Sequence, residues 1–539
     1  MKPELLNSLK GYKLKYLAND LIAGLLVAII ALPMSIAMGI QSVPQNSAIN
    51  GLQLGIITSI IGGFIISLSG GSRFQIGGPT AAFFVIICSY IANADIGLLG
   101  LQFATILAGF WLLIFALMKG GNILKFLPYP ITIGFTTGVG IVLLVGQFKD
   151  FLGVNASGTG AIDKIVSCIQ NISTFNLANF LIALLALVII IIIQKVNRKI
   201  PGAFVAIIIC TVVYVILNNT VKDLNIATIG SRYGNIKAQF NILDFGSISQ
   251  IKWTKIIVPS FTLAALCMME SLLSAKVADG IANTTHNPNQ ELLGQGVANI
   301  LSPIFGGLPV IGAIARTSVN IESGAKSSLA GIFHAIFIFI MYFSLMGVMK
   351  YIPLAVFASI LVVVAINMAN FPMFLKIFKF GVRDGIIVTV SCVLTVIFNL
   401  IYGILAGITV SLIINIANMT KKLTVKEREA DGKKVYNVTG AVYFISVNKL
   451  IKIMEKKKNL DKEVIFNFAS VKSIDQSSIE RLKDYQNMLK GLGKTLIIIN
   501  CNNIVHKRIS AFSNILEYNY YDINANQKQS LLAQNNCSI

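Results

Sequence analysis

Two short stretches, about 230 residues apart, share a pattern of residues that suits the binding of an anion. One is GGPTAA at residues 77–82, and the other is GGLPVIGA at residues 306–313. Each combines a Gly/Pro break with an apolar segment that is too short to cross a bilayer. A helix that begins at such a break offers unpaired backbone N–H groups and the positive end of its dipole. Paired breaks at matching places in two halves indicate the binding site of a transporter.

The residues at the two helix starts are the first candidates for contacts to a substrate. Their side chains are mostly small, so a ligand has room to approach the backbone. Close packing of helices through small residues is the alternative, but the recurrence in both halves favours binding. The first span adds an interruption at Pro33, where a kink could open toward the same cavity. The candidates at the two helix starts are Thr80, Ala81, Ala82, Gly312, Ala313 and Ile314.

Ionisable residues inside the apolar segments are few, so each is a functional candidate. Glu270 lies in LCMMESLLS, where an acid must be paired, hydrated or neutralised. It therefore suits proton coupling, and a permanent salt bridge with a base is the alternative. Arg316 lies four residues after Gly312 and could present its guanidinium to an oxyanion. A salt bridge to Glu270, or snorkelling to the membrane surface, explains Arg316 equally well.

These candidates need a polytopic membrane domain to position them. The chain of 539 residues is 55 % hydrophobic and 12 % charged, with a mean hydropathy of +0.75. We expect no removable signal peptide and an all-α domain of fourteen spans over residues 1–420. Each half has seven spans, and because this number is odd the two halves have opposite orientations in the membrane, which makes them an inverted repeat. The third and tenth spans, at equivalent places in the two halves, are short. We place the spans near residues 20–40, 50–68, 79–92, 97–118, 129–149, 176–195, 203–218, 256–279, 289–306, 311–321, 326–349, 353–370, 384–399 and 402–420.

The formal net charge of +21 does not indicate a nucleic-acid partner. In the membrane region the excess of Lys and Arg lies mostly in short loops, which an even number of spans places on the cytoplasmic side. We therefore expect a multi-pass protein of a bacterial inner membrane with both termini in the cytoplasm. The seven Cys and three His are scattered, which predicts neither disulfides nor a metal site. Since no nucleotide-binding or nucleophile motif occurs, we expect no enzyme and no cofactor, and transport driven by an ion gradient or by exchange.

The long apolar segments end near Thr420, and the sequence that follows is more charged. We predict a charged linker at residues 421–434 and a small cytoplasmic α/β domain at residues 435–539. We expect Ser477 to cap a helix there, and phosphorylation of Ser477 or Ser478 is an alternative. Residues 521–539 are polar and we expect them to be poorly ordered. The strands and helices alternate over residues 435–444, 449–458, 463–468, 477–492, 495–499 and 502–512.

Four motifs in combination resemble the SulP (sulfate permease) family of anion transporters. They are ALPMSIAMGI at residues 31–40, GGSRFQIGGPTAAF at 70–83, NQELLGQGVANI at 289–300 and GGLPVIGAIART at 306–317. The tail, with VIFNFASVKSIDQSSI at residues 464–479, is similar to a STAS domain, the usual cytoplasmic partner in that family. The resemblance implies two inverted seven-helix repeats, a substrate-binding core, a gate, and a homodimer. It also implies transport of sulfate, bicarbonate, chloride or a small dicarboxylate.

The resemblance also implies roles for individual residues. The anion would lie between the first-span break, with Pro33 and Ser35, and the two half-helix starts, with Arg316 nearby. Glu270 occupies the position of the cation-coupling acid, and Ser274 that of a neighbouring hydroxyl ligand.

The chain departs from the family pattern at one position that bears on coupling. Sodium-coupled bicarbonate members carry Asp at the position of Glu270 and a hydroxyl at that of Ile314. Because Ile314 has no atom that can bind sodium, protons are the favoured coupling ion.

We therefore predict a secondary active transporter of small anions that is coupled to protons and works in the lipid bilayer by alternating access. An uncoupled anion exchanger or channel is one alternative, and a membrane sensor that signals through the α/β domain is another. A nucleobase carrier of the same fold is disfavoured, since a neutral ring has no use for Arg316. The sequence does not identify the anion.

Overall fold

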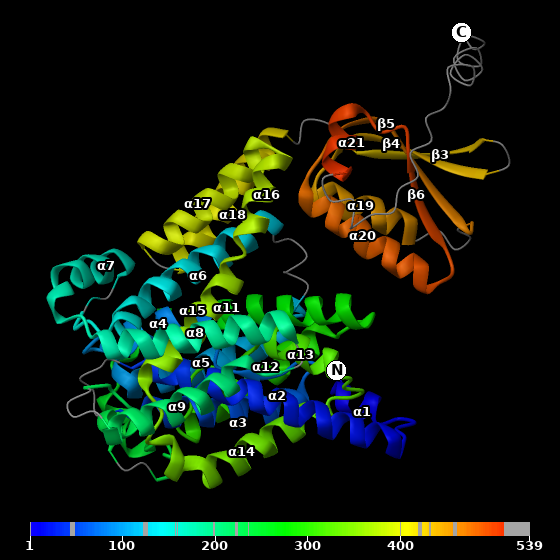
Figure 1. Cartoon of the computed structure of the whole chain (residues 1–539). Coiled ribbons are helices and arrows are strands. Elements are labelled where there is room, and N and C mark those ends of the chain that lie inside the picture. The colour runs from blue at the N-terminus through cyan, green and yellow to red at the C-terminus, as the bar shows by residue number, and fades with distance from the viewer. Residues whose placement is uncertain are drawn as a thin grey trace. The chain divides into compact units, whose positions relative to one another are not determined.

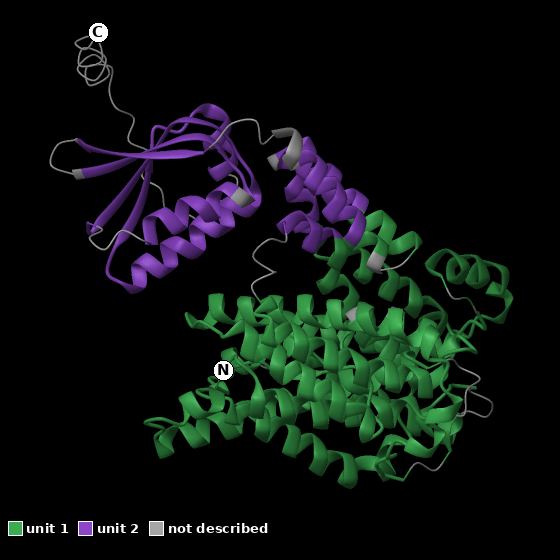
Figure 2. Ribbon diagram, turned by 180° about the vertical axis from the view of Figure 1, so that it is seen from behind, with its two compact units in different colours: residues 1–125, 135–371, 391–404 green, residues 126–134, 372–390, 405–539 purple. Residues whose placement is uncertain are grey.

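The chain divides into two compact units, which Figure 2 distinguishes by colour. Unit 1 comprises Met1–Lys125, Phe135–Phe371 and Ser391–Ile404, and unit 2 comprises Phe126–Gly134, Pro372–Val390 and Leu405–Ile539. The computed structural model describes residues 2–43, 49–121, 128–156, 158, 160–197, 200–220, 225–234, 237–398, 400–418, 423–430, 433–455 and 461–510. The predicted disorder of residues 521–539 lies outside the described residues.

Each of the fourteen predicted spans is a helix in the structure, with ends that differ from the prediction by a few residues (Figure 1). Nine helices of the described part of the chain are long and apolar enough to cross a membrane. The first seven spans are α2 (Leu14–Gln41), α3 (Gly51–Ser69), α4 (Ala81–Ala92), α5 (Gly97–Leu117), α6 (Tyr129–Leu152), α8 (Leu177–Val196) and α9 (Gly202–Thr220). The second seven are α11 (Trp253–Ala282), α12 (Pro288–Ile304), α13 (Ile314–Glu322), α14 (Leu329–Met349), α15 (Leu354–Ala369), α17 (Val382–Ile397) and α18 (Leu400–Asn418).

The two sets of seven correspond in order. The short helices α4 and α13 are the third member of each set, as an internal repeat requires. Shorter helices outside the sets are α1 (Glu4–Ser8), α7 (Ala161–Gln170), α10 (Ile229–Tyr233) and α16 (Phe371–Phe380), together with the 3-10 turns Ile172–Thr174 and Phe245–Gln250.

Close helix packing in unit 1 brings α2 and α3 together. A Cβ atom on Gly55 of α3 would overlap the backbone carbonyl of Ser35 on α2. A glycine is therefore required there, and the helices approach as small residues allow in membranes. α2 also packs on α14, and α12 packs on both α3 and α5. This contact between α2 and α3 fixes the position of Ser35 against α3.

The predicted interruption of the first span is not present. α2 continues through Pro33, which is buried within it. Pro33 has no N–H group, so the carbonyl of Ile29 lacks its usual intrahelical partner. The packing of α2 against α3 and α14 keeps the helix continuous across this point. The expectation of a broken first span is therefore wrong.

The α/β part of unit 2 contains a four-stranded sheet in the order β3-β4-β5-β6. β3 pairs antiparallel with β4, whereas β4 with β5 and β5 with β6 pair in parallel. α19 and α20 lie side by side along the sheet (Figure 1), and their apolar faces form one buried cluster with the strands. The elements are β3 (Thr424–Ala430), β4 (Lys433–Val442), α19 (Phe444–Glu455), β5 (Glu463–Ile474), α20 (Gln476–Gly491), β6 (Thr495–Ile499) and α21 (Asn503–Ser510).

Two expectations for this part need correction. Residues 424–430, within the predicted linker, form β3 and pair with β4 over their whole length. β3 is an edge strand, and its charged side chains, which suggested a linker, are those that edge strands use against aggregation. The cap of α20 is Asp475, whose carboxylate accepts the N–H of Ser478 at 2.8 Å, and not Ser477.

Candidate functional site

The two Gly/Pro breaks meet directly in unit 1. β1 (Gly77–Gly78) pairs antiparallel with β2 (Ile311–Gly312), so that Gly77 lies opposite Gly312. The N–H of Ala313 adds a hydrogen bond to the carbonyl of Ile76 at 2.9 Å. Antiparallel pairing means that the two breaks run in opposite directions, as oppositely oriented repeats require. The sequence therefore predicted correctly that these stretches belong together.

Polar side chains of neighbouring helices satisfy the backbone around the breaks. The Thr317 hydroxyl on α13 accepts the N–H of Ile76 at 3.1 Å. The Ser271 hydroxyl on α11 accepts the N–H of Gly312 at 3.0 Å. Such partners are what irregular backbone at membrane depth needs. The two breaks are therefore parts of one hydrogen-bonded assembly.

Asn299 on α12 forms hydrogen bonds to the residue that directly precedes β2. Its amide oxygen accepts the N–H of Val310 at 2.9 Å, and its amide nitrogen donates to the carbonyl of the same residue at 2.8 Å. Asn299 is buried, and it lies in one of the four family-like motifs. Its role was missed by the sequence reasoning, although its place in that motif was a usable signal.

Each break leads into a half-helix. α4 starts at Ala81 after Thr80, and α13 starts at Ile314 after Ala313. Neither Thr80 nor Ala313 caps its helix with a side-chain hydrogen bond. The Thr80 hydroxyl is buried and has no hydrogen-bond partner in the structure. The two starts thus keep a free hydroxyl and uncapped N-terminal ends close to the β1–β2 pair.

Two further candidates were predicted at the helix starts, Ala82 and Gly312. Ala82 lies in the first turn of α4. Gly312 lies in β2, where a Cβ atom would overlap the side-chain amide of Gln75. Gln75 in turn donates to the carbonyl of Ser271 at 3.1 Å. Glycine at position 312 therefore leaves room for the Gln75 side chain beside β2.

Arg316 is almost completely buried, at 1 % exposure, on the first turns of α13. Its Nη1 donates to the Ser59 hydroxyl at 2.8 Å, and its Nη2 donates to the Ser35 hydroxyl at 3.0 Å. Longer contacts of 3.5 and 3.3 Å run to the carbonyls of Gly77 and Pro79. Arg316 therefore ties α13 to α2, α3 and β1, and it does not snorkel.

The partners of Arg316 change the expected role of Ser35. The Ser35 hydroxyl is buried, donates to the carbonyl of Ala31 at 2.6 Å and accepts from Arg316. It holds the guanidinium in place. Among the five N–H donors of Arg316, only that of Nε has no partner in the structure.

Glu270 lies on α11 and is 6 % exposed. No ion pair to Glu270 occurs within the described part of the chain, and its Oε1 atom is buried without a hydrogen-bond partner. The hydroxyl of Ser274, one helical turn further on, is buried and unpartnered as well. Glu270 and Arg316 therefore do not form a salt bridge in this structure, so a salt bridge does not explain the presence of either charged group in the membrane region.

Glu291 lies in the first turn of α12 and is fully buried. Its Oε2 atom accepts the N–H groups of Gly71 and Ser72 at 2.9 and 3.0 Å, and its Oε1 atom accepts Gln295 Nε2 at 2.9 Å. Glu291 thus anchors the turn that leads from α3 into the first break. The place of Glu291 in the motif at residues 289–300 was a usable signal, as for Asn299, but its partners lie about 220 residues away in the sequence, so the contact itself was not predictable.

The architecture is that of a membrane transporter with two oppositely oriented repeats whose broken helices meet. The sequence profile described as the sulfate permease family matches residues 17–391. The chain belongs to the sulfate permease family, a family of transporters and not of enzymes. The match ends before the α/β part, so the resemblance of that part to a STAS domain stays a prediction, with which its mixed sheet is consistent.

Two curated relatives illustrate the range of the family. A putative sulfate transporter, YvdB of Bacillus subtilis, is 33 % identical over 529 residues, which covers 95 % of this chain and 97 % of that protein. The bicarbonate transporter BicA of Picosynechococcus is 30 % identical over 411 residues, which covers 75 % of this chain and 70 % of that protein.

Two solved structures share the fold. The transmembrane domain of a cyanobacterial BicA superposes with a TM-score of 0.65 at 28 % identity and covers 74 % of this chain and 98 % of that one. The structure of SLC26A9 superposes with a TM-score of 0.68 at 17 % identity and covers 99 % of this chain and 92 % of that one. The expected fold class, a helical membrane domain followed by a small α/β region, is confirmed.

Proposed function

We propose that the protein is a secondary active transporter of small anions that binds its substrate beside the β1–β2 pair. The observation that carries the proposal is the pairing of Gly77 with Gly312, which joins two uncapped helix starts. Both starts direct the positive ends of their dipoles toward this region, which favours an anion. The proposed contacts are the hydroxyl of Thr80 and backbone N–H groups of Ala81, Ala82 and Ile314, while the N–H of Ala313 is already bonded to the carbonyl of Ile76.

Arg316 would act as a fixed positive charge behind the substrate. Four of its five N–H groups already have partners, so it offers little direct hydrogen bonding to a ligand. Its charge is nevertheless unpaired by any acid among the described residues, and burial strengthens its field. An anion at the helix starts would supply the missing negative charge.

Glu270 would couple transport to protons. A buried carboxyl without a basic partner has to be neutralised by a proton or a bound cation. Ser274 is the free hydroxyl nearest to it along α11, and Ile314 offers no ligand for sodium. These features support a proton as the coupling ion, with an uncoupled exchanger or channel as the alternative.

A small oxyanion is the substrate class that fits this chemistry best. Sulfate is the first choice, because the relative named as a putative sulfate transporter matches almost the whole chain. Bicarbonate and a small dicarboxylate are the other candidates. Transport would follow alternating access in a homodimer in the inner membrane, with both termini in the cytoplasm and no cofactor.

Uptake into proteoliposomes tests the proposal. Labelled sulfate, bicarbonate and succinate are offered side by side at two external pH values, with the internal pH held constant. We expect accumulation of at least one anion above its equilibrium level, and more of it at the lower external pH. Flux that never exceeds equilibrium under any proton or sodium gradient would support the uncoupled alternative instead.

A further inference from the structure

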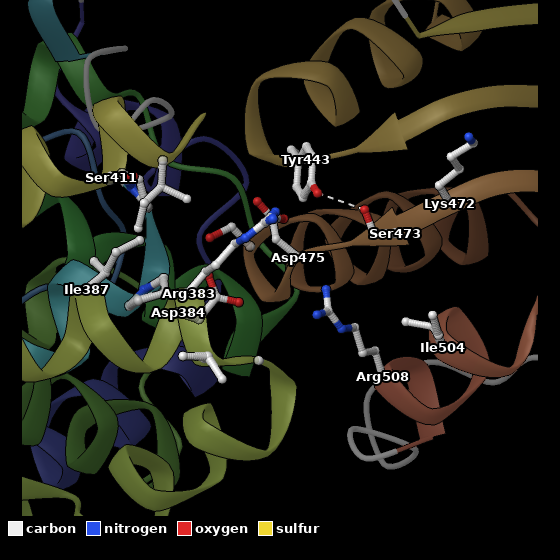
Figure 3. A pocket seen from close by; sticks show the side chains of 16 residues that line it. Arg383, Asp384, Ile387, Ser411, Tyr443, Lys472, Ser473, Asp475, Ile504 and Arg508 are labelled. Atoms are coloured by element: carbon white, nitrogen blue, oxygen red, sulfur yellow. Dashed lines mark hydrogen bonds between the residues drawn. The ribbon is translucent and has the colours of Figure 1, made fainter. Parts of the chain in front are cut away.

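Partly buried charges occur at two places outside the candidate transport site. The first is a cavity of about 500 Å³ within unit 2 (Figure 3). Arg383 and Arg508 both act there on the charge of Asp384. Arg508 also acts on that of Asp475, so each of these charges has an opposite charge nearby. The second place is Lys164 on α7, whose ammonium lies against an aromatic ring and forms no ion pair within the described part of the chain.

Lys164 connects α7 to the half-helix α4. Its Nζ atom lies 5.5 Å from the ring centroid of Phe84, at the end of the first turn of α4. The ring is buried, with Phe84 at 2 % exposure. Asp150 and Lys149 on α6 lie close enough to act on the charge of Lys164. This cation–π contact therefore holds α7 against a helix whose start belongs to the candidate site.

A hydrogen bond nearby connects α2 to α6. Gln41 is the last residue of α2, and its Nε2 donates to the carboxylate of Asp150 at 2.6 Å. α2 also carries Ser35, one of the partners of Arg316. Asp150 lies close to the end of α6, and α7 follows α6 in the chain. This amide contact and the cation–π contact thus lie at one face of unit 1, where α2 and α6 end.

The helices on the two sides of these contacts belong to different packing groups. α4 and α13 of the candidate site both pack on α2, which also packs on α3 and α14. α6 instead packs on α15, where the Thr137 hydroxyl donates to the carbonyl of Ala369 at 2.6 Å and Gly140 leaves room for the backbone of Ala369. α8 packs on α9 and α15, and Asn179 on α8 donates to the backbone carbonyl of Asp150 at 2.8 Å. Both contacts therefore cross the boundary between the two groups, along which α2 also meets α9 and α15.

We propose that the cation–π contact and the amide contact form a latch that keeps the candidate site closed toward this face, and that both contacts break when the two packing groups separate. The inference rests on the proposed alternating access, in which the proposed orientation makes this face the external one. Each contact is a single side-chain interaction, so it changes a conformational equilibrium by a factor of a few and does not lock it. The latch therefore favours the closed state and still opens in every transport cycle.

Thiol labelling of the full-length protein in proteoliposomes tests the latch without a transport measurement. Ala37→Cys, with the native cysteines replaced, places a thiol at a buried position of α2 between Ser35 and Gln41. Two membrane-impermeant methanethiosulfonates of opposite charge are added to one side of the bilayer at a time. Opening speeds the labelling by both reagents, whereas a change in local charge speeds one and slows the other.

Removal of either contact should speed the labelling from this face by about threefold to fivefold, and removal of both by about tenfold or more. Lys164→Met and Gln41→Met each keep an unbranched side chain but lose the contact. Lys164→Arg keeps the cation, so labelling should stay slow. Lys149→Met neutralises the neighbouring lysine, which makes neither contact, and is the matched control with no expected effect.

The cation–π contact is also tested as a pair. Phe84→Leu should speed the labelling as much as Lys164→Met, and the double variant should add nothing further, because both changes remove the same contact. The latch is overturned if neither Lys164→Met nor Gln41→Met speeds the labelling, or if Lys149→Met speeds it equally. It is also overturned if the effects of Lys164→Met and Phe84→Leu add. Anion accumulation by the parent is measured separately, so a latch that fails in a transporting parent leaves the proposed function standing. A parent that labels as expected but accumulates no anion would instead contradict the proposed function.

Discussion

Arg316 Nη1 lies 2.8 Å from the Ser59 hydroxyl, and this bond links the short helix of the second repeat to a full-length helix of the first. The guanidinium is thus fixed by neutral oxygens on three other segments. No acid within the described ranges neutralises this charge, so it is available to an anion, and it does not have to move in order to act.

Replacement of Arg316 should weaken anion binding. We expect Arg316→Ala to raise the concentration for half-maximal uptake by about tenfold or more, since one buried charge is worth at least about 1.4 kcal/mol to an anion. The half-maximal concentration for Arg316→Lys should lie between those of the parent and Arg316→Ala, because an ammonium keeps the charge but cannot make the same set of contacts. Arg73→Ala, which removes a partly buried ion pair to Glu4, is the control. Unchanged affinity in folded Arg316→Ala would assign Arg316 to structure alone.

Glu270→Gln should abolish the dependence of uptake on the proton gradient. The amide keeps the shape of the side chain but cannot exchange a proton, so exchange of internal for external anion should persist while accumulation stops. Uptake with and without an imposed pH difference measures this, and size-exclusion chromatography checks that the protein stays folded. A gradient response equal to that of the parent would exclude Glu270 as the coupling group.

Gly78→Ala should displace the guanidinium, since a Cβ atom at Gly78 would overlap Arg316 Nη1. We expect a loss of about 1–3 kcal/mol in stability and a large loss of uptake. Gly280→Ala on α11 has open space around its Cβ and serves as the control. In the Arg316→Ala background the stability cost of Gly78→Ala should shrink, because the overlapping atoms are gone. An equal cost in both backgrounds would contradict this explanation.

Glu291→Gln should loosen the turn that enters the first break. An amide cannot accept at both ends, so either the N–H groups of Gly71 and Ser72 or the amide of Gln295 lose a partner. We expect the thermal stability of the detergent-solubilised protein to fall by the equivalent of about 1–3 kcal/mol. The exposed acid Glu322, replaced by Gln, should leave stability unchanged. A Glu291→Gln protein as stable as the parent would show that the turn does not need this anchor.

Cys501 in the α/β part should react slowly with alkylating reagents. Burial raises the pKa of its thiol to about 11, so only a small fraction is thiolate at neutral pH. The rate of alkylation should therefore rise by about tenfold per pH unit between pH 7 and 9, without a plateau. A variant that keeps Cys501 as its sole cysteine allows a direct measurement by mass spectrometry. A rate that levels off near pH 8 would mean an ordinary, exposed thiol.

The sequence predicted the positions of the spans because long apolar runs, charged loops and Gly/Pro breaks are local signals. It also predicted that residues 77–82 and 306–313 act together, since both repeats carry the same kind of break. It could not predict that Ser35 and Ser59 hold Arg316, because that depends on how closely α2 and α3 pack. Ser35 was accordingly expected to bind substrate, and the structure gives it a supporting role.

The errors in the C-terminal part have a similar origin. Residues 424–430 read as a linker because charged residues dominate them, yet backbone pairing with β4 makes them a strand whatever their side chains. Ser477 and Asp475 are both good capping residues, and only the geometry of the chain decides which of them starts the helix. At Pro33, tertiary packing overrides a local signal for interruption.

The antiparallel pair of β1 and β2 has a consequence for biosynthesis. Gly77 enters the membrane about 230 residues before its partner Gly312 has been made, at ribosomal rates a delay of roughly 10 to 50 seconds. During this interval the polar backbone of the first break lacks its final partners in a nonpolar surrounding. Until then, water, the translocon or lipid headgroups must satisfy the polar backbone of the first break. Nascent chains truncated before residue 312 never gain the second break, and we expect membrane quality-control proteases to remove them.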